Sequence, residues 1–407
     1  MKAAHEERAL SDEHRPSRRR AGPVLFSYGF RPFFLAAGLA AFILVPLWAW
    51  SLAAPAALPV AWPPSLWHAH EMVFGFAAAA IAGFLLTAVP SWTGRKGFAG
   101  WPLVLLFALW LAARLVVAAS GLLPRVLVAA VSLSFLPLLM GLLAWPLLRE
   151  RNRNTPLLFV LATLWVCQCA FHWAAWHSDF DASRQAVVTA INLVLVLVTV
   201  IGGRIVPSFT ANALRLSGSK VLPRAANWLT PAAVTLMVGI VIVDVLRPGG
   251  ALAGVVALAA AAVQAARISQ WRGLHTLRMP IVWILHLGYA WIPIGLGLKA
   301  WALLGENPWG ANWLHALTIG AMATMIVAVM TRTSLGHTGR TLEPHRLTVA
   351  AYGFLGLATL VRVAGPMVPV VSYLTIVVTS AALWTAAFAL YLWVYAPILV
   401  GPRESQS

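Results

Sequence analysis

Long apolar segments follow one another along almost the whole chain, and they limit the possible folds more than any other feature. Each is roughly 20 residues long, the length that an α-helix needs to cross the hydrocarbon core of a bilayer. The 407 residues are 60% hydrophobic and only 10% charged, whereas a soluble domain carries about 25% charged residues. We therefore expect an all-α polytopic membrane protein with no soluble domain.

The apolar runs, separated by polar or turn-forming loops, predict about twelve transmembrane helices. The predicted spans lie near residues 24–50, 68–90, 101–119, 125–147, 156–177, 186–210, 228–246, 250–270, 280–304, 312–334, 346–365 and 369–399. We expect a membrane domain at 24–400, a basic tail at 1–23 and a short tail at 401–407. A cleaved signal peptide is the alternative for the first apolar segment, but that segment is longer than a usual signal sequence.

The net charge of +17 could indicate nucleic-acid binding, but the placement of the basic residues indicates a membrane orientation instead. Besides the N-terminal tail, alternate loops carry the basic residues: 95–96, 149–153, 215–224, 267–278 and 340–346. An excess of Lys and Arg marks the cytoplasmic loops of membrane proteins. We therefore expect both termini in the cytoplasm, contact with membrane lipid, and no nucleic-acid partner.

Ionisable side chains stand at the start of the second predicted span, in the stretch WHAHEMVFGF (67–76). Such groups are costly at membrane depth and often mark functional sites. With the N-terminus inside, the second and tenth spans start on the outer side, and the fifth span ends there. Five of the eleven histidines therefore converge on one layer near the outer face: His68, His70, His172, His177 and His315.

An internal repeat relates two of these histidines. Residues 70–95 and 315–340 match under one offset of 245 residues, which superposes His70 on His315 and the sequence TGR at both ends. The sixth span joins in, because VPSWT of the second span recurs there as VPSFT. We expect three four-helix units, and folds of this kind often place their site at the repeat interface. A chance match is the alternative.

Helical geometry divides the histidine layer between two centres. His68 and His70 are two residues apart, about 200° around an α-helix, so they face opposite ways. His70 and its repeat mate His315 begin facing helices at equal depth, which suits axial ligation of a haem iron by two imidazoles. Arg114, deeper in the third span, can pair with a carboxylate or with a haem propionate.

The second centre is expected on the face that carries His68. That residue shares its helix face with Glu71, three residues on, and His172 or His177 of the fifth span would complete a site for copper or another haem. His68 and Glu71 are the candidate catalytic residues, with Glu71 as a proton carrier. The alternative is that these histidines belong to an interfacial aromatic belt and bind no metal.

Four stretches of the sequence together resemble the NnrS family of bacterial inner-membrane proteins. They are FSYGFRPFFLAAGL (26–39), WHAHEMVFGFAAAAIAGFLLTAVPSWTG (67–94), GGRIVPSFTANALR (202–215) and LHALTIGAMATMIVAVMTRTSLGHTGR (314–340). The resemblance implies a twelve-helix protein that contains haem and copper and takes part in the response to nitric oxide. Its members occur in denitrifying bacteria and in others that meet nitrosative stress. The resemblance assigns no ligands, so the assignments above rest on helix geometry.

The layout is also similar to the catalytic subunit of haem–copper oxidases and nitric oxide reductases. Those proteins have twelve helices in three four-helix arcs, with haem ligands on the second and tenth, and the likeness is one of architecture. They also carry a metal-ligating histidine on the sixth helix and a histidine pair just after it, whereas the sixth span here has none. His172, His177 and His286 would have to substitute, so a copied dinuclear centre is not expected.

Two functional hypotheses follow. The first is an inner-membrane haem protein, with haem of the b type and copper as a second metal, that binds nitric oxide and protects against nitrosative stress. In this hypothesis the protein acts as an oxidoreductase that reduces NO to N2O with electrons from an unidentified donor. The alternative is a non-enzymatic haem or copper binding protein, sensor or transporter that protects other metal centres. Bound metal without consumption of NO would distinguish the alternative.

Overall fold

The computed structural model describes residues 23–54, 58–224, 226–305 and 312–404. Within these residues every regular element is a helix, and twelve helices are long and apolar enough to cross a membrane. The prediction of an all-α polytopic membrane protein is therefore confirmed. Of the predicted N-terminal tail, only Pro23 belongs to the described residues.

Each span is either one helix or a helix in consecutive pieces. The elements of the spans are α2 (Phe30–Ala53), α3 (Pro64–His70), η2 (Glu71–Ala77), α4 (Ala78–Thr93), α5 (Trp101–Ala118), α6 (Arg125–Ser132), α7 (Phe135–Arg149), α8 (Pro156–Trp176), α9 (Phe180–Leu216), α10 (Leu229–Leu246), α11 (Ala251–Ser269), α12 (Pro280–Leu304), α13 (Trp313–His315), η5 (Ala316–Ala323), α14 (Thr324–His337), α15 (Arg346–Ala364) and α16 (Tyr373–Val400). Short 3₁₀ helices lie before and between them: η1 (Val24–Ser27), η3 (Gly273–Thr276) and η6 (Gly365–Met367).

The sixth span differs most from its predicted bounds of 186–210. The helix α9 is 37 residues long, and it begins early because Asp179 caps it, with Oδ1 accepting a hydrogen bond from the backbone N–H of Ala182 at 2.9 Å. At 1.5 Å per residue, α9 is about 55 Å long. A bilayer core is about 30 Å thick, so the polar ends of α9 extend beyond the apolar layer.

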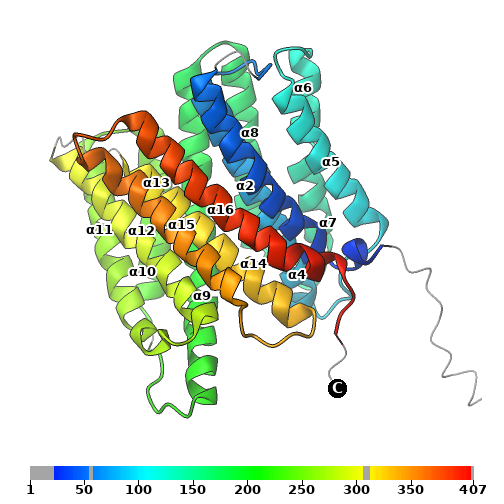
Figure 1. Cartoon of the computed structure of the whole chain (residues 1–407), viewed down its shortest axis with the longest axis vertical. Helices are drawn as coiled ribbons and strands as arrows, with labels where there is room; N and C mark the ends of the chain where they lie inside the picture. Colours follow the sequence, from blue (N-terminus) through cyan, green and yellow to red (C-terminus); the bar gives the residue numbers. More distant parts are fainter. Residues whose placement is uncertain (1–22, 55–57, 225, 306–311, 405–407) are drawn as a thin grey trace, which may run out of the picture.

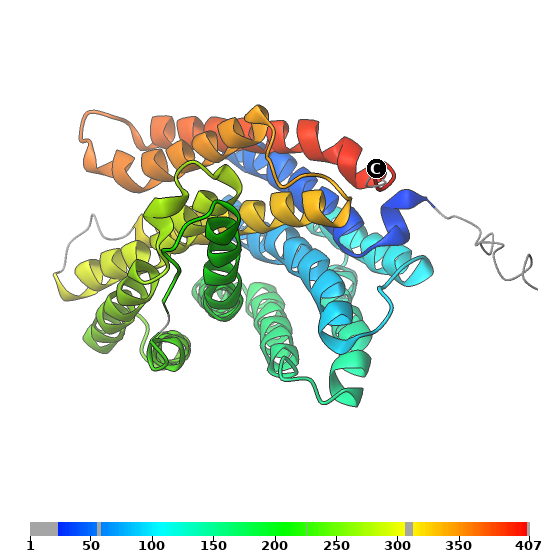
Figure 2. The same ribbon diagram turned by 90° about the horizontal axis from the view of Figure 1, so that it is seen from below.

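The three spans that the sequence repeat relates form the middle of the bundle. Their apolar windows are 78%, 72% and 67% buried for the second, sixth and tenth spans, and the other nine spans are less buried. In Figure 2 these spans, coloured light blue, green and yellow to orange, lie between the outer helices. Side chains on these three spans are therefore better shielded from lipid than side chains on the other nine spans. The division into three units remains a prediction.

The first and last spans lie side by side (Figure 1). Arg31, at the start of α2, donates hydrogen bonds from Nη1 to the carbonyl oxygens of Leu399 at 2.8 Å and Gly401 at 2.6 Å. Carbonyls at a helix C-terminus lack intrahelical partners and favour a nearby cation, so the buried Arg31 is satisfied without a carboxylate. Both described ends of the chain thus lie at one face, which we call the terminal face. The other is the opposite face.

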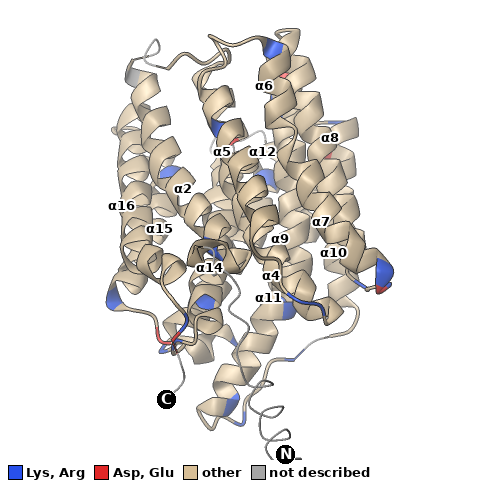
Figure 3. Cartoon of the chain, turned by 90° about the vertical axis from the view of Figure 1, so that its right-hand side faces the viewer, with Lys and Arg blue, Asp and Glu red and all other residues tan. Residues whose placement is uncertain are grey.

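Charge is distributed unevenly along the bundle. Lys and Arg gather at the terminal face, and fewer lie in the middle or at the opposite face (Figure 3). The middle of the bundle nevertheless contains buried charged residues, among them Glu71, Arg114 and Arg362. Since charges at this depth are costly, the contacts of these residues show where the functional site lies.

Candidate ligand pocket and histidine cluster

His70 and His315 occupy matching places in their spans, because a π-helical segment follows each of them directly. His70 precedes η2, and His315 precedes η5. π-Helical turns are uncommon and are found frequently at functional sites. The offset of 245 residues that relates the two sequences thus also relates two local distortions of the helix.

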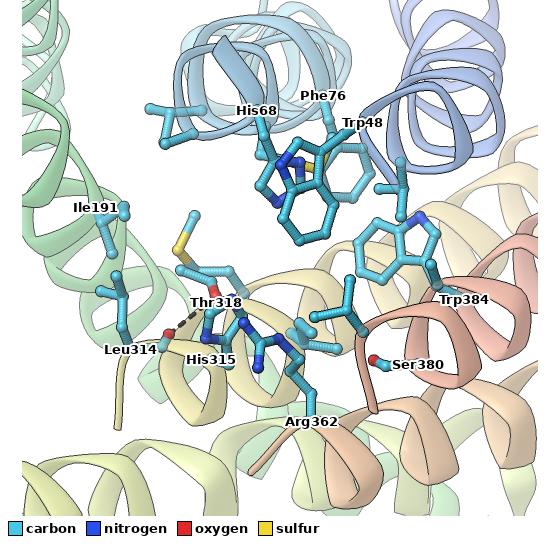
Figure 4. A pocket seen from close by; sticks show the side chains of 18 residues that line it. Trp48, His68, Phe76, Ile191, Leu314, His315, Thr318, Arg362, Ser380 and Trp384 are labelled. Atoms are coloured by element: carbon cyan, nitrogen blue, oxygen red, sulfur yellow. Dashed lines mark hydrogen bonds between the residues drawn. The ribbon is translucent and has the colours of Figure 1, made fainter. Parts of the chain in front are cut away.

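A cavity lies beside the beginning of both π-helical segments, and we call it the histidine pocket. It encloses about 110 Å³, and the space between its lining side chains is about 810 Å³ when its open mouth is included. Its polar lining consists of His68, His315, Thr318, Arg362 and Ser380, apart from two tryptophans, and the remaining lining side chains are apolar (Figure 4). These side chains come from α2, α3, α9, α13, α15, α16 and both π-helical segments.

The imidazoles of His68 and His315 lie on opposite sides of this pocket (Figure 4). Trp48 stacks on His68, with ring centroids 4.1 Å apart and planes inclined by 19°, and this contact fixes the plane of the imidazole. Nδ1 of His68 is buried and has no hydrogen-bond partner among the described residues. A buried polar atom without a partner costs free energy, so a bound ligand that supplies one would stabilise the pocket.

Arg362 of α15 brings a positive charge to the same pocket. Its Nη2 donates a hydrogen bond to the hydroxyl of Tyr373 at 2.8 Å, and its guanidinium lies over that ring. Its Nη1 is buried without a partner, and none of the ion pairs among the described residues includes this arginine. Buried charges in proteins are usually paired. The pocket can therefore bind an anionic group beside the two imidazoles.

A second buried group lies on the other side of the same span, and we call it the histidine cluster. It consists of His70, Glu71, Arg114 and His172. Nδ1 of His70 lies 2.9 Å from Oε1 of Glu71, and this oxygen also accepts a hydrogen bond from Nη1 of Arg114 at 2.7 Å. The rings of His70 and His172 lie 5.4 Å apart and are inclined by 82°. The cluster thus joins two imidazoles to a buried ion pair.

The hydrogen bond to Glu71 determines which nitrogen of His70 is available. A carboxylate accepts from Nδ1–H, and the tautomer with that proton leaves a lone pair on Nε2. Nε2 of His70 and Nε2 of His172 are both buried without a partner among the described residues. A carboxylate behind an imidazole is the usual support of a metal-ligating histidine. In the described part of the chain no three His, Cys, Asp or Glu residues converge as metal ligands, so the cluster offers two imidazoles.

A smaller polar cavity of about 60 Å³ leads from the loops of the opposite face to this cluster, and we call it the vestibule. His172 lines it together with Ser120, Arg125 and Ser178. Arg125 is held at its rim, because Nη1 donates a hydrogen bond to the carbonyl oxygen of Trp176 at 2.9 Å. One imidazole of the cluster is therefore reachable from the polar end of the bundle, whereas His70 is fully buried.

The structure brings most of the predicted site residues together, but it pairs them differently. His68, and not His70, shares the pocket with His315, so the expected pair of His70 and His315 is not formed. Glu71 contacts His70 and not His68. The reason is that Arg114 of the next span binds the same carboxylate oxygen of Glu71 that lies against His70. His172 lies beside His70 in the histidine cluster and not beside His68.

Two further predicted residues are placed as follows. His177 joins neither group: it is exposed at the end of α8, and its Nδ1 lies 2.8 Å from the carbonyl oxygen of Trp173. Arg114 pairs with the Glu71 carboxylate, which is one of the two partners that its position predicts. Its Nε is buried without a partner among the described residues, so a role beside a haem propionate stays a prediction.

The sequence analysis missed several buried charged residues, among them Arg362, Asp244 and Lys299. Arg362 stands inside the eleventh apolar run, and that position alone would have indicated it. Asp244 and Lys299 form a buried ion pair, and Asn192 donates a hydrogen bond to Oδ2 of Asp244 at 2.8 Å. Nζ of Lys299 also lies 4.8 Å from the ring centroid of Trp313, two residues before His315. This pair connects α9, α10 and α12 behind the histidine pocket.

Twelve candidate spans around a pocket of imidazole and guanidinium groups define a polytopic membrane protein with a buried polar cavity. The chain belongs to the NnrS family: the family model described as NnrS protein matches residues 24–403, nearly the whole chain. A comparison with curated proteins finds no match. The resemblance seen in four stretches of sequence is thus confirmed, and membership fits a membrane protein of the nitric oxide response that is associated with haem and copper.

Proposed function

We propose that this protein binds haem in the histidine pocket, binds nitric oxide there, and thereby limits nitrosative stress at the bacterial inner membrane. The observation that carries the proposal is a single cavity with an imidazole on either side and an arginine whose Nη1 has no partner among the described residues. Imidazoles ligate haem iron, and a guanidinium binds carboxylates. His68 and His315 would therefore hold the iron, and Arg362 would hold a propionate.

The residues present fit a haem in chemistry, because two imidazoles and a guanidinium line one largely apolar cavity. Met72 and Met322 line it, and methionines adapt readily to the shape of a ligand. Cys167 and Cys169 lie on α8 and do not line the pocket, which favours a non-covalent haem of the b type. When bound, haem supplies an iron that can bind NO where NO takes the place of one of the two imidazoles.

The histidine cluster is proposed to hold copper. Its two unpartnered Nε2 atoms, on His70 and His172, are ligands that copper accepts. Glu71 fixes the tautomer of His70, and Arg114 fixes Glu71, so each partner supports the next. The vestibule gives an ion a polar approach to His172.

A second candidate function is the reduction of NO. Two NO molecules, two electrons and two protons give one N2O and one water, so this reaction needs a proton carrier and an electron donor. The observation that favours it is Glu71, a buried carboxylate in the same span as His68. Two imidazoles, His70 and His172, connect Glu71 to the vestibule. Binding of NO remains the better supported function, because it requires only the pocket.

The first experiment is a reduced-minus-oxidised optical spectrum of the purified protein, repeated with NO, for the wild type and three histidine variants. We expect low-spin haem bands that change with NO. His68→Ala and His315→Ala should lose these bands, whereas His177→Ala, a matched replacement of an exposed imidazole, should keep them. An intact haem spectrum in either pocket variant would refute the ligand assignment. An NO electrode with a chemical electron donor then separates binding from turnover.

Metal analysis tests the copper site separately. His70→Ala and His172→Ala should each lower bound copper strongly, because each removes one of only two proposed ligands. Both variants should retain haem. His68→Ala should retain copper. Equal copper in the wild type and in both cluster variants would exclude the cluster as its site.

A further inference from the structure

We propose that an uncharged diatomic molecule reaches the histidine pocket from the hydrocarbon core of the membrane, through two apolar cavities stacked against α9. The identity of the natural guest as NO rests on the proposed function. The route itself rests on three cavities with shared walls. We call the second cavity the junction cavity and the third the groove.

The groove lies deeper in the bundle than the histidine pocket, between α4, α9 and α14. It encloses about 80 Å³, is partly open, and all its lining side chains are apolar. Among them, Phe84, Ile201, Ile205 and Val329 are half-exposed. All of these lie far from the ends of their spans, so an opening there faces lipid tails and not water. Apolar gas molecules concentrate in such a medium because water excludes them.

The junction cavity shares walls with both of the others. It encloses only about 10 Å³, roughly the space that one water-sized sphere needs. Val73 lines it and also lines the histidine pocket, while Ile81 and Val194 line it and also line the groove. These three aliphatic side chains are therefore the partitions between adjacent spaces.

Two spans confirm that the groove and the pocket are stacked closely. On α9, Ile191 lines the histidine pocket and Val194 lines the groove; on the tenth span, Met322 lines the pocket and Met325 lines the groove. Three helical residues rise about 4.5 Å. Flexible methionines at this level can move aside for a small guest. A diatomic molecule therefore has to pass about one helical turn of aliphatic and thioether side chains.

Xenon is the probe for this route, because it is apolar, fills cavities of this kind and needs no haem. Crystals of the full chain under xenon pressure should show density in the groove and, in protein without haem, in the histidine pocket as well. Exchange between bulk and bound xenon, measured by saturation transfer with hyperpolarised xenon, gives the access rate. Val194→Phe and Ile81→Phe enlarge the partitions and should slow this exchange by about tenfold, through a higher barrier. Val194→Ala should accelerate it.

Val238→Phe is the matched control, since Val238 is exposed on α10 and lines none of the three cavities. It should exchange xenon at the wild-type rate. Wild-type rates in both Phe variants, or a groove without xenon density, would overturn the route. If Val194→Phe does not fold, Val194→Ala and Ile81→Phe still decide it. A protein without haem bands would refute the proposed function, yet the xenon rates would still be measurable and would decide the route.

Discussion

Arg114 supports the histidine cluster indirectly, because it pairs with Glu71, which in turn contacts His70. Both members of this pair are buried, and Arg114 holds the oxygen of Glu71 that faces His70. Removing one member of a buried pair leaves an uncompensated charge and typically costs about 3–5 kcal/mol. We expect Arg114→Met to lower the midpoint of thermal unfolding in detergent markedly and to lower copper binding.

Two further variants serve as controls for this effect. Arg95→Met breaks a solvent-exposed pair with Glu150, and such pairs contribute only about 0–1 kcal/mol, so its midpoint should stay near that of the wild type. Glu71→Gln combined with Arg114→Met removes both charges and should recover much of the loss. Equal midpoints for Arg114→Met and Arg95→Met would show that the buried pair is not the cause.

Each π-helical segment contains a glycine that packs directly against a large side chain of a neighbouring helix. A Cβ at Gly75 would lie 2.7 Å from Nη1 of Arg114, and one at Gly320 would lie 2.5 Å from Cγ of Trp291. The two glycines differ by the same 245 residues as His70 and His315. Each glycine therefore permits the close packing of its π-helical segment.

Gly320→Ala should destabilise the protein, because the indole of Trp291 is buried and cannot move away from a new methyl group. Overpacking of this kind costs about 1–3 kcal/mol, and it should be measurable as a lower midpoint of thermal unfolding. Gly297→Ala is the control, since a Cβ there meets nothing within 4 Å and alanine favours a helix by about 0.5–1 kcal/mol over glycine. A midpoint for Gly320→Ala as high as that of Gly297→Ala would contradict the packing argument.

The spans were predictable from the sequence, and the pairing within the site was not. Apolar length alone indicates a membrane helix, and the two histidines of the second span face opposite sides of it, as their spacing predicts. A π-helical segment leaves no trace in a run such as EMVFGFA (71–77), because nearly all of its residues are apolar and periodicity cannot be read. Which histidine Glu71 contacts also required the structure, because its carboxylate pairs with Arg114 of another span.

The partners of Arg362 illustrate a second limit of sequence reasoning. An arginine in an apolar run can donate its hydrogen bonds to the carbonyls of a helix end, as Arg31 does to α16 and the residue after it. It can instead pair with a carboxylate, as Arg114 does with Glu71. Only packing reveals that Arg362 has an unpartnered nitrogen in a cavity with two imidazoles. The residue type and depth of Arg362 identify a buried cation, but its role depends on the five other spans that line the pocket.

At the scale of the whole molecule, the orientation in the membrane follows from charge and from the even number of spans. The terminal face carries most of the Lys and Arg (Figure 3), and basic loops remain on the cytoplasmic side. We therefore expect the terminal face in the cytoplasm and the vestibule on the outer side. Copper and protons would then reach the histidine cluster from outside, while an apolar gas would arrive from the membrane itself.

Cysteine labelling tests this orientation on one helix, because α9 has an exposed residue beyond each end of its apolar run. In a chain with Cys167 and Cys169 replaced by alanine, Asp181→Cys should react with a membrane-impermeant maleimide in intact cells. Lys220→Cys, just past the other end of α9, should react only after the membrane is permeabilised. The reverse pattern would place the vestibule on the cytoplasmic side and would contradict the orientation predicted from the Lys and Arg residues. Labelling of both sites in intact cells would mean that the cells leak, so a cytoplasmic marker protein must stay unlabelled in the same sample.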